Sequence, residues 1–440
     1  MSWVRDKLGS SSEHIACIEA GHHCSYAELQ QRIDALCARL TDCPRQSVIA
    51  IQSTQTIDGI AALLAIAELE LIALPLGAQL TPTDSETYKA IAAADYNLRI
   101  DEVDSALIPL TAGPRPALYQ HLSGSGLILF SSGTSGTPKA MLHDLNALLA
   151  RFKSVRPRTD RSVQLLLLDH IGGFDSAFRT LFAGSTLIIP DERSPEALGR
   201  ALEKHRATVL PASPTFLNLL LLEGIPNRYD CSSVKIIAYG AEAMPAPLLK
   251  RLAAAFPQAE LQQKFGTSET GAIRIRSRHP ESLFFSIQDL DTEWKVIDDE
   301  LWLRTPSRIL GYLNADNATL ESDGWYRTGD LVETDSEGHL RIVGRKTALI
   351  NIGGQKVHPG EIEAVLHPMT EVDACHVFAK SDPILGNVVA CEITTRSSDD
   401  MRTWKRRIRS HCRGRLAAWK IPTQVHIKAH LGLTDRLKRA

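Results

Sequence analysis

The sequence predicts an α/β protein, and three changes of pattern along the chain carry this prediction. Up to about residue 277, segments with helical periodicity alternate with short β-branched or leucine-rich runs, which is typical of βαβ units around mostly parallel sheets. From about 281 to 343, short alternating strands are separated by glycine, aspartate and asparagine turns. A compact α+β pattern follows. We therefore expect a large N-terminal domain over residues 1–344, with stacked sheets, helices and a small β-rich subdomain, and a small mobile α+β domain over 345–440.

The N-terminal part reads as alternating helices and strands. Helices are expected over residues 26–40, 57–68, 146–155 and 195–206. The last of these has a clear start, because Ser194 is a good N-cap and Pro195 suits the first turn. Strands are expected over 47–51, 126–130, 163–168, 186–190, 207–211 and 234–239. This alternation predicts a doubly wound body.

The later part has shorter elements. In the β-rich subdomain we expect strands over 293–298, 300–305 and 339–344. The C-terminal domain is expected to contain a helix over 359–366, strands over 374–379 and 388–395, a basic helix over 401–415 and a final strand over 423–428.

Composition limits the classes of function. With 440 residues, 44% of them hydrophobic, the chain can bury a sizeable core. A net charge of −2 gives no overall attraction to nucleic acid or to an anionic membrane. The N-terminus has no apolar signal-peptide segment. Eight cysteines show neither CxxC pairs nor zinc-ligand spacing, so we expect free thiols and a cytoplasmic protein.

The segment SSGTSGTPKA, residues 131–140, has the composition of a phosphate-binding loop. It follows the strand expected over 126–130 and precedes the helix expected near 146, so its amides and hydroxyls can converge on an anion. In a Walker A loop the lysine is followed directly by Ser or Thr. Lys139 instead lies between Pro138 and Ala140, which disfavours a P-loop kinase or GTPase. A flexible Gly/Ser surface loop is the alternative.

Five further motifs follow this loop in a fixed order. They are YGAEAMP from 239, KFGTSETG from 264, GWYRTGDL from 324, GRKTALINIGGQKV from 344 and LGLTDRLKRA from 431. Together with the loop they resemble the adenylate-forming superfamily, which contains acyl- and aryl-CoA synthetases, the adenylation domains of peptide synthetases, and firefly luciferase. The resemblance runs from Ser131 to Lys438, about three quarters of the chain.

The resemblance implies a site for ATP and magnesium. It implies that Phe265 lies beside adenine, that Glu269 helps to hold Mg²⁺, and that Asp330 accepts hydrogen bonds from the ribose hydroxyls, which Arg345 also reaches. A carboxylate suits a hard cation that bridges phosphates. The other residues that it implies at the nucleotide are Ser131, Ser132, Gly133, Thr134, Ser135, Gly136, Thr137, Lys139, Gly240, Ala241, Glu242, Gly266 and Thr267.

The resemblance also implies a hinge and a catalytic lysine. Thr347 stands where family members often have Asp or Lys as the pivot, and a small residue can absorb the backbone change of a domain rotation. Lys438 aligns with the family's final lysine, whose ammonium would stabilise charge on the carboxylate and α-phosphate. Gly432 and Leu437 replace the proline and glycine of that motif. The alternative is that Lys438 is only a residue of a basic tail.

The segment DHIGGFDSAF, residues 169–178, stands where the family has a histidine or aromatic gate beside the acid. The resemblance implies an acid pocket, with His170 also as a catalytic group, that is lined by His170, Ile171, Gly172, Phe174, Tyr239, Gly240 and Gly271. Alternatively, the two glycines only turn the strand into a helix, and His170 is structural.

The implied reaction has two steps. A carboxylic acid, an aryl or short acyl acid by preference, reacts with Mg-ATP to give an acyl-adenylate and pyrophosphate. Rotation about Thr347 then brings Gly353, Gly354, Gln355 and Lys356 beside a pantetheine thiol. That thiol belongs to coenzyme A or to an acyl carrier protein. A non-catalytic nucleotide-binding relative is a third alternative.

Two further segments bear on partners. From residue 401 the chain is strongly basic, which favours the phosphates of coenzyme A or an acidic carrier protein, although such a run is often only a solvated helix face. The first 120 residues or so are shorter than the resemblance leads us to expect, which would leave a trimmed acid pocket or expose the surface of a homodimer.

Overall fold

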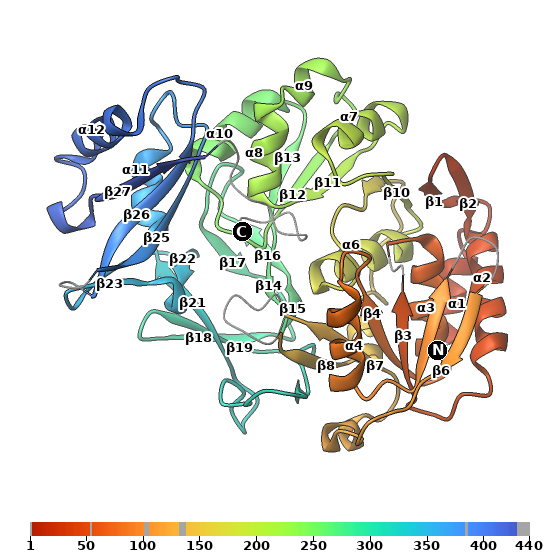
Figure 1. Ribbon diagram of the computed structural model, residues 1–440. Helices are drawn as coiled ribbons and strands as arrows, with labels where there is room; N and C mark the ends of the chain where they lie inside the picture. Colours follow the sequence, from red (N-terminus) through yellow and green to blue (C-terminus); the bar gives the residue numbers. More distant parts are fainter. Residues whose placement is uncertain (1, 53–54, 101–104, 132–137, 383–385, 429–440) are drawn as a thin grey trace.

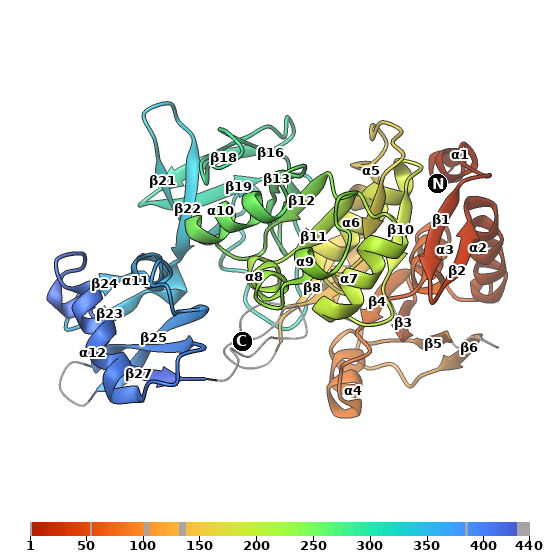
Figure 2. The same ribbon diagram turned by 90° about the horizontal axis from the view of Figure 1, so that it is seen from above.

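A computed structural model of the chain describes residues 2–52, 55–100, 105–131, 138–382 and 386–428. It confirms the α/β class. Figures 1 and 2 show a large body with the C-terminal part, drawn in blue, on one side of it.

The first seven-stranded sheet runs in the order β20-β8-β7-β4-β3-β5-β6. Its strands are β3 (Val48–Gln52), β4 (Ile72–Leu76), β5 (Tyr96–Ile100), β6 (Ser105–Pro109), β7 (Gly126–Phe130), β8 (Ala140–Asp144) and β20 (Gly311–Tyr312). Strands β5, β3, β4 and β7 are parallel, whereas β6, β8 and β20 run antiparallel to their neighbours. The sheet therefore brings the ends of β7 and β8 beside β20, which is distant in sequence.

The second seven-stranded sheet runs in the order β13-β12-β11-β9-β10-β1-β2. Its strands are β1 (Ile15–Glu19), β2 (His22–Ser25), β9 (Arg161–Val163), β10 (Thr186–Ile189), β11 (Val209–Ala212), β12 (Ile236–Tyr239) and β13 (Glu260–Gln263). Only β2 pairs antiparallel; the other neighbours are parallel. Parallel strands align their carboxyl ends at one edge, where ligands of open α/β sheets bind.

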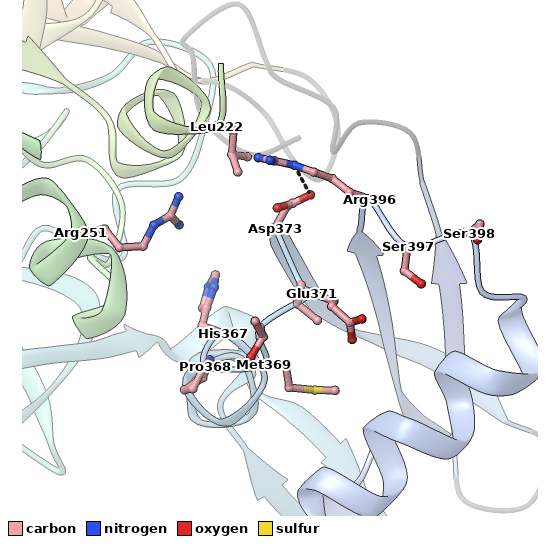
Figure 3. Close-up of a pocket in the computed structure, with 12 residues that line it drawn as sticks. Leu222, Arg251, His367, Pro368, Met369, Glu371, Asp373, Arg396, Ser397 and Ser398 are labelled. Carbon is pink, nitrogen blue, oxygen red and sulfur yellow. Dashed lines mark ion pairs between the residues drawn. The ribbon is translucent and has the colours of Figure 1, made fainter. Parts of the chain in front are cut away.

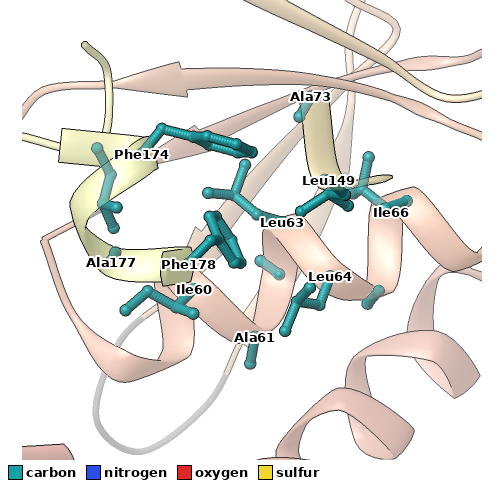
Figure 4. Close-up of a cluster of buried hydrophobic side chains, with 14 of the residues drawn as sticks. Ile60, Ala61, Leu63, Leu64, Ile66, Ala73, Leu149, Phe174, Ala177 and Phe178 are labelled. Atoms are coloured by element: carbon teal, nitrogen blue, oxygen red, sulfur yellow. The ribbon is translucent and has the colours of Figure 1, made fainter. Parts of the chain in front are cut away.

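One helical layer fills the space between the two sheets. It consists of α1 (Ser2–Gly9), α2 (Tyr26–Leu40), α3 (Ile57–Glu68), α5 (Leu145–Ala150) and α6 (Ile171–Phe182). Figure 4 shows Phe174 and Phe178 of α6 beside Ile60 and Leu63 of α3, all in the largest hydrophobic core. Burying each such side chain contributes about 1.5–3 kcal/mol, so this layer fixes α6 firmly.

Other helices cover the outer faces of the two sheets. The first sheet is covered by α4 (Pro82–Ile91) and the 3₁₀ helix η1 (Ala117–His121). The second is covered by α7 (Pro195–Lys204), α8 (Pro214–Leu222), α9 (Ile225–Arg228) and α10 (Ala246–Ala255).

The β-rich subdomain is an antiparallel six-stranded sheet in the order β16-β17-β22-β21-β19-β18. Its strands are β16 (Ile275–Ser277), β17 (Phe285–Ile287), β18 (Glu293–Ile297), β19 (Glu300–Arg304), β21 (Tyr326–Thr334) and β22 (Leu340–Arg345). A small hairpin, β14 (Phe265–Thr267) with β15 (Gly271–Ile273), joins it to the second sheet.

The C-terminal part follows the expected α+β order. It contains η2 (Lys346–Ala348), the hairpin β23 (Ile350–Ile352) and β24 (Gln355–Val357), α11 (Pro359–Leu366), β25 (Ala374–Asp382), β26 (Gly386–Thr394), α12 (Met401–Cys412), η3 (Ala418–Lys420) and β27 (Gln424–Ile427). Trp404 of α12 is fully buried against the three-stranded sheet β25-β26-β27, so this part has a core of its own.

The segment 131–139 differs in context from the expectation. It does not lead from a strand directly into a helix, because β8 intervenes and pairs antiparallel with β7. The segment therefore connects two antiparallel strands, and helix α5 begins only after Asp144, which caps it by accepting from the Ala147 amide at 2.9 Å. Five residues of β8 are too short for periodicity to distinguish a strand from a loop.

Two observations bear on the environment of the protein. All eight cysteines lie in described segments and are free, as predicted. Among the residues that the structure describes, no helix combines the length and apolar character needed to span a bilayer.

Candidate active site

The base of the 131–139 loop is held by backbone and side-chain hydrogen bonds. The Ser131 amide donates to the Lys139 carbonyl at 3.0 Å, and the Lys139 amide donates to Ser131 Oγ at 3.1 Å. Asn314 braces the same point, because its Nδ2 donates to the Pro138 carbonyl at 2.9 Å and its Oδ1 accepts from the Ala140 amide at 2.8 Å. The two ends of the loop are therefore clamped together.

Tyr312 connects this loop to Glu269. Its hydroxyl donates to Glu269 Oε1 at 3.0 Å, and its ring lies 5.3 Å from Lys139 Nζ. Burial, together with the negative charge of Glu269, raises the pKa of Tyr312 above its usual value, so the phenol stays protonated and remains a donor. Lys139 and Glu269, the expected magnesium ligand, thus both lie beside the Tyr312 side chain.

Glu269 lies on a short, well-fixed turn between β14 and β15. Thr267 Oγ1 accepts from the amides of Glu269 and Thr270, both at 3.2 Å, and lies 3.1 Å from Thr270 Oγ1. The Glu269 carbonyl accepts from the Ile309 amide at 2.7 Å. Such side-chain bonds hold a tight turn in one conformation, which fixes the backbone of Glu269, while the bond from Tyr312 holds its carboxylate.

Asp330 and Arg345 form an ion pair across neighbouring strands. They are opposite each other in the register of β21 and β22, and Arg345 Nε donates to Asp330 Oδ1 at 2.9 Å. Asp330 is 6% exposed. Burial raises the pKa of Asp330 and Arg345 opposes this, while Asp330 raises the pKa of Arg345. Glu269 acts electrostatically on both residues, so all three belong to one site.

The glycines of two motifs allow close approach of backbone segments. A Cβ atom at Gly266 would lie 2.3 Å from the Gly271 carbonyl oxygen, and one at Gly240 would lie 2.6 Å from the Lys264 carbonyl oxygen. Next to Gly240, Ala241 has φ of +69°, a left-handed conformation that costs a non-glycine residue about 1–2 kcal/mol. Strain of this kind is often found at functional sites.

Phe265 and Glu242, which were expected at the nucleotide, contact the β-rich subdomain and the start of α8. The half-buried ring of Phe265 lies 5.5 Å from the ring of Phe285, in the core of the β-rich subdomain. Glu242 Oε2 accepts from the Thr215 amide at 3.2 Å, in the first turn of α8. The structure therefore gives the Glu242 carboxylate a contact with a helix N-terminus.

The residues expected at the acid divide into two groups. His170 is the N-cap of α6, where its Nδ1 accepts from the Gly172 amide at 3.1 Å. Ile171 and Phe174 are buried in the core between the two sheets. Their burial follows from the phase of the helix, because residues three or four apart share a face.

Tyr239 and Gly271, which were also expected at the acid, lie at the end of β12 and at the start of β15. The Tyr239 ring is buried in the core beneath α8 and α10, and its hydroxyl has no hydrogen-bond partner in the described part of the chain. Burial raises the pKa of Tyr239 to about 12. Gly271 has φ of +76° and begins β15.

The residues expected at the hinge and thiol are exposed. Thr347 lies in η2, directly after β22. Gly353 and Gly354, with φ of +55° and +88°, form the turn of the β23–β24 hairpin, and the Gly354 amide donates to Asn351 Oδ1 at 3.1 Å. Gln355 and Lys356 are exposed on the same hairpin. The expected residues Ser132, Gly133, Thr134, Ser135, Gly136, Thr137 and Lys438 lie outside the described residues.

A polar cleft of about 690 Å³ lies between the body and the C-terminal part. Its lining contains none of the expected site residues that the structure describes. Figure 3 shows Leu222 and Arg251 on one side and the segment from His367 to Asp373 on the other. The contact beside it is a hydrogen bond of 3.2 Å from Asn218 Nδ2 to the Asp373 carbonyl. Such a polar boundary is typical of domains that move relative to each other.

Sequence analysis missed three side chains at the site. Tyr312 and Asn314 lie in or beside the two-residue strand β20, which no local pattern reveals. Arg151, the C-cap of α5, donates to Ser307 Oγ at 2.9 Å and to Asp289 at 3.2 Å, and it also contacts the Ala272 carbonyl. The sequence around Arg151 does not indicate that this side chain contacts residues so far along the chain.

Comparison with known proteins agrees with this geometry. The chain matches the AMP-binding enzyme family over residues 126–313 and the C-terminal domain of AMP-binding enzymes over 361–438, together more than half of its length. It is 25% identical over 462 residues to the 2-succinylbenzoate–CoA ligase of Listeria innocua, covering 98% of this chain and 96% of the relative. It is 26% identical over 423 residues to the 4-coumarate–CoA ligase-like 9 protein of Arabidopsis thaliana, covering 84% and 75%.

Solved structures support the fold. The anthranilate CoA ligase AuaEII in complex with anthranoyl-AMP superposes with a TM-score of 0.84 at 19% identity, covering 99% of this chain and 95% of that one. The fold and the paired residues thus define an adenylate-forming enzyme. The chain belongs to the AMP-binding enzyme family, and it is an acid–thiol ligase.

Proposed function

We propose that the enzyme activates a carboxylic acid with Mg-ATP to form an acyl-adenylate and pyrophosphate, and then transfers the acyl group to the thiol of coenzyme A. The observation that carries this proposal is the convergence of Lys139, Tyr312 and Glu269 with the Asp330–Arg345 pair. The printed names of relatives that are CoA ligases favour coenzyme A as the acceptor.

The described residues fit the nucleotide and its metal. Arg345 occupies Oδ1 of Asp330, so Oδ2 can accept the ribose hydroxyls, and the guanidinium opposes the rise in the pKa of Asp330 that burial causes. Tyr312 occupies Oε1 of Glu269, which leaves Oε2 as an oxygen ligand of the kind that Mg²⁺ prefers. When bound, the metal neutralises charge on the phosphates.

In the first step, a carboxylate oxygen of the acid forms a bond to the α-phosphorus. The bond from this phosphorus to the bridging oxygen breaks, and pyrophosphate leaves with the electron pair towards the 131–139 loop. Lys438 would stabilise the negative charge that accumulates on the reacting oxygens. His170, at the start of α6, is proposed to contact the acid.

In the second step, the thiol sulfur attacks the acyl carbon, the thiol proton is released, and AMP leaves with the electron pair of the cleaved bond. We place the domain boundary between residues 344 and 345, with Thr347 as the pivot. The exposed hairpin turn at Gly353 and Gly354 would then approach the pantetheine arm. The polar cleft at the Asn218–Asp373 contact is consistent with such a rotation.

A carrier protein is the second candidate acceptor. Helix α12 buries Trp404 and Ile408 and exposes its other face. That exposed face carries Arg402, Lys405, Arg406 and Arg409. A basic surface of this kind favours an acidic protein as well as the phosphates of coenzyme A.

The test is a screen for pyrophosphate release with aryl and short acyl acids, with and without coenzyme A. We expect pyrophosphate and AMP, and an acyl-CoA only when coenzyme A is present. Release of ADP, or no turnover with any acid, would contradict the proposal. Acyl transfer only to a pantetheinylated carrier protein would favour the second acceptor.

A further inference from the structure

The expected ribose motif forms a bulge in β21. The register between β19 and β21 shifts within residues 300–302, so that residues 328–330 of β21 stand opposite the single residue Leu301. Gly329, in the middle of this bulge, has φ of +71°, a conformation that suits glycine. Residues of a bulge leave the regular hydrogen-bond ladder, so their backbone donors need other partners.

Two side chains supply these partners. Glu300 Oε1 accepts from the Gly329 amide at 3.1 Å. Thr328 Oγ1 accepts from the Asp330 amide at 3.0 Å and itself donates to the Leu301 carbonyl at 2.6 Å. The backbone that presents the Asp330 carboxylate is therefore held by Glu300 and Thr328.

Glu300 is a buried carboxylate in a fixed position. It is the first residue of β19 and follows a two-residue turn, Asp298 and Asp299, whose φ angles of +50° and +62° suit a tight β-hairpin. Side chains alternate along a strand, so Glu300 and the core residue Leu301 point to opposite faces. Glu300 is nevertheless only 4% exposed, and a carboxylate withdrawn from water needs hydrogen bonds and a cation.

Lys346 is the cation that pairs with Glu300 among the described residues. Its Nζ donates to Glu300 Oε2 at 3.0 Å. Lys346 directly follows Arg345, which pairs with Asp330 at 2.9 Å, and it directly precedes Thr347. Two consecutive residues are thus tied to the body by ion pairs, immediately before the proposed pivot.

The two ion pairs belong to one electrostatic unit. Burial raises the pKa of Asp330, Arg345 opposes this, and the charges of Glu269 and Glu300 raise it further. Glu300 is therefore close enough to Asp330 for the two carboxylates to repel each other. Each has its own cation, Arg345 or Lys346, which reduces the cost of keeping both carboxylates charged.

Contacts across the pivot include two that are not ion pairs. Strands β21 and β22 lie next to the C-terminal part (Figures 1 and 2). There His358 packs against Gly344, where a Cβ atom would lie 2.8 Å from His358 Nδ1, and Asn218 Nδ2 donates to the Asp373 carbonyl at 3.2 Å. Breaking such contacts costs less than leaving a buried carboxylate without its cation. We therefore expect the backbone change of a rotation to occur after Lys346.

We propose that Glu300 is a positioning residue that fastens both the ribose turn and Lys346 to β19. Domain rotation then begins at Thr347 and leaves the nucleotide contacts of Asp330 and Arg345 in place, so the acyl-adenylate stays bound between the two steps. The inference rests on the two-step reaction proposed above and deepens it. Without this anchor the backbone change spreads to the residues before the pivot, and the acyl-adenylate is released and hydrolysed by water to the acid and AMP.

The test measures how much acyl-CoA is formed for each pyrophosphate released. The probes are benzoate, cinnamate and butanoate, each with Mg-ATP and excess coenzyme A. We expect a ratio of about one for the native chain and a ratio at least about threefold lower for Lys346→Gln, because a half-exposed ion pair is lost. The rate of pyrophosphate release by Lys346→Gln should stay within about threefold of the native rate, since the proposed ATP contacts are retained.

A double-mutant cycle shows whether the two side chains act through one contact. Glu300→Gln keeps an oxygen for the Gly329 amide but removes the charge, so it should lower the ratio as Lys346→Gln does. The double variant should be no worse than the more affected single variant, because both substitutions break the same ion pair. Additive effects of the two substitutions would overturn the proposal.

Two further variants separate the charge effect from loss of structure. Lys346→Arg keeps the cation and should restore most of the native ratio. Arg341→Gln removes an ion pair with Glu333 that joins the same strands, β21 and β22, and it should leave the ratio unchanged. The melting temperature of each variant shows whether it is folded.

The inference and the proposed function fail in different ways. If every variant keeps the native ratio, Glu300 has only a structural role, while the two-step reaction stands. If the native chain releases no pyrophosphate with any of these acids, acid activation is contradicted. If it releases pyrophosphate but forms no acyl-CoA, the second step is contradicted. In both of these cases the inference falls with the proposed function.

Discussion

The two ends of the candidate site differ in how their charged side chains are paired. At the nucleotide end, Asp330 is paired with Arg345 at 2.9 Å and Glu269 with Tyr312 at 3.0 Å. At the end proposed for the acid, Lys264 donates to the neutral Gln262 at 3.0 Å. Charged groups that already have partners are preorganised for a ligand that is the same in every reaction. At the end proposed for the acid, recognition depends on the substrate as well, so we expect selectivity between acids to arise there.

The same contrast appears in how each end is built. The nucleotide end consists of neighbouring strands and a turn whose own hydrogen bonds fix Glu269. The acid end combines a helix face with a sheet face from distant parts of the chain. Substitutions at the first end should therefore act on every acid alike, and substitutions at the second should act on some acids only.

The largest effect is expected at Lys438. Lys438→Ala should lower the rate of pyrophosphate release about 10²- to 10³-fold for every acid, because one ammonium that stabilises developing charge is lost. The rate of acyl transfer from a chemically prepared acyl-adenylate to coenzyme A should change little. An unchanged rate of pyrophosphate release would instead favour a non-catalytic relative, and Lys428→Ala, on a lysine that pairs with Glu392, serves as the control.

The next effect is expected at Asp330. Asp330→Asn should raise the KM for ATP and lower kcat/KM about 100-fold, because it weakens the bonds to ribose and leaves Arg345 without its charge partner. The ratio of kcat/KM between any two acids should stay the same. Asp335→Asn is a matched control on the neighbouring turn of the same sheet, where the carboxylate pairs with Arg278. If Asp330→Asn changes the preference between two acids, the nucleotide end and the acid end do not act independently.

Much of the fold followed from local signals. Helix α2 begins and ends as predicted, because Ser25 and Glu28 form a capping box and the apolar residues keep one face. Helices α3 and α11 also have the predicted bounds. The alternating strands of the β-rich subdomain were visible for the same reason. These elements depend on near neighbours in sequence.

The rest depends on distant contacts. Strand β8 was missed because its partners are β7 and, far along the chain, β20. Tyr312 follows from this pairing, so no local pattern indicates it. Phe174 was expected at the acid because the segment 169–178 resembles the family's gate, and its spacing from Phe178 and Leu181 matches the buried face of α6. Lys264 was quoted only as part of a motif, since its bond to Gln262 is a property of the folded site.

A smaller effect tests the acid end. Arg179→Gln leaves the Asp175 carboxylate without its partner on the polar side of α6. We expect the KM for the acid to rise about tenfold, while the KM for ATP stays within about twofold. Arg200→Gln, in a similar pair with Glu196 one turn away on α7, is the matched control. An equal rise in the KM for ATP would show that the two ends are not separable.

The smallest effect concerns the scaffold of the nucleotide end. His143 of β8 is fully buried, and neither ring nitrogen has a hydrogen-bond partner among the described residues. Burial lowers the pKa of His143 to about 3. In the unfolded chain the same group has a pKa of about 6.5, so the unfolded state binds a proton first as the pH falls. Stability is therefore lost progressively as the pH drops below about 6.5.

Between pH 7.5 and 5.5 this loss amounts to about 1.4 kcal/mol, or roughly 2 °C in melting temperature. His143→Leu should remove this part of the acid sensitivity and cost little at pH 7.5, since a buried ring without partners is replaced by an apolar group. His279→Leu, at an exposed histidine, should leave the pH dependence as it is. If His143→Leu keeps the full difference in melting temperature between the two pH values, another group is responsible.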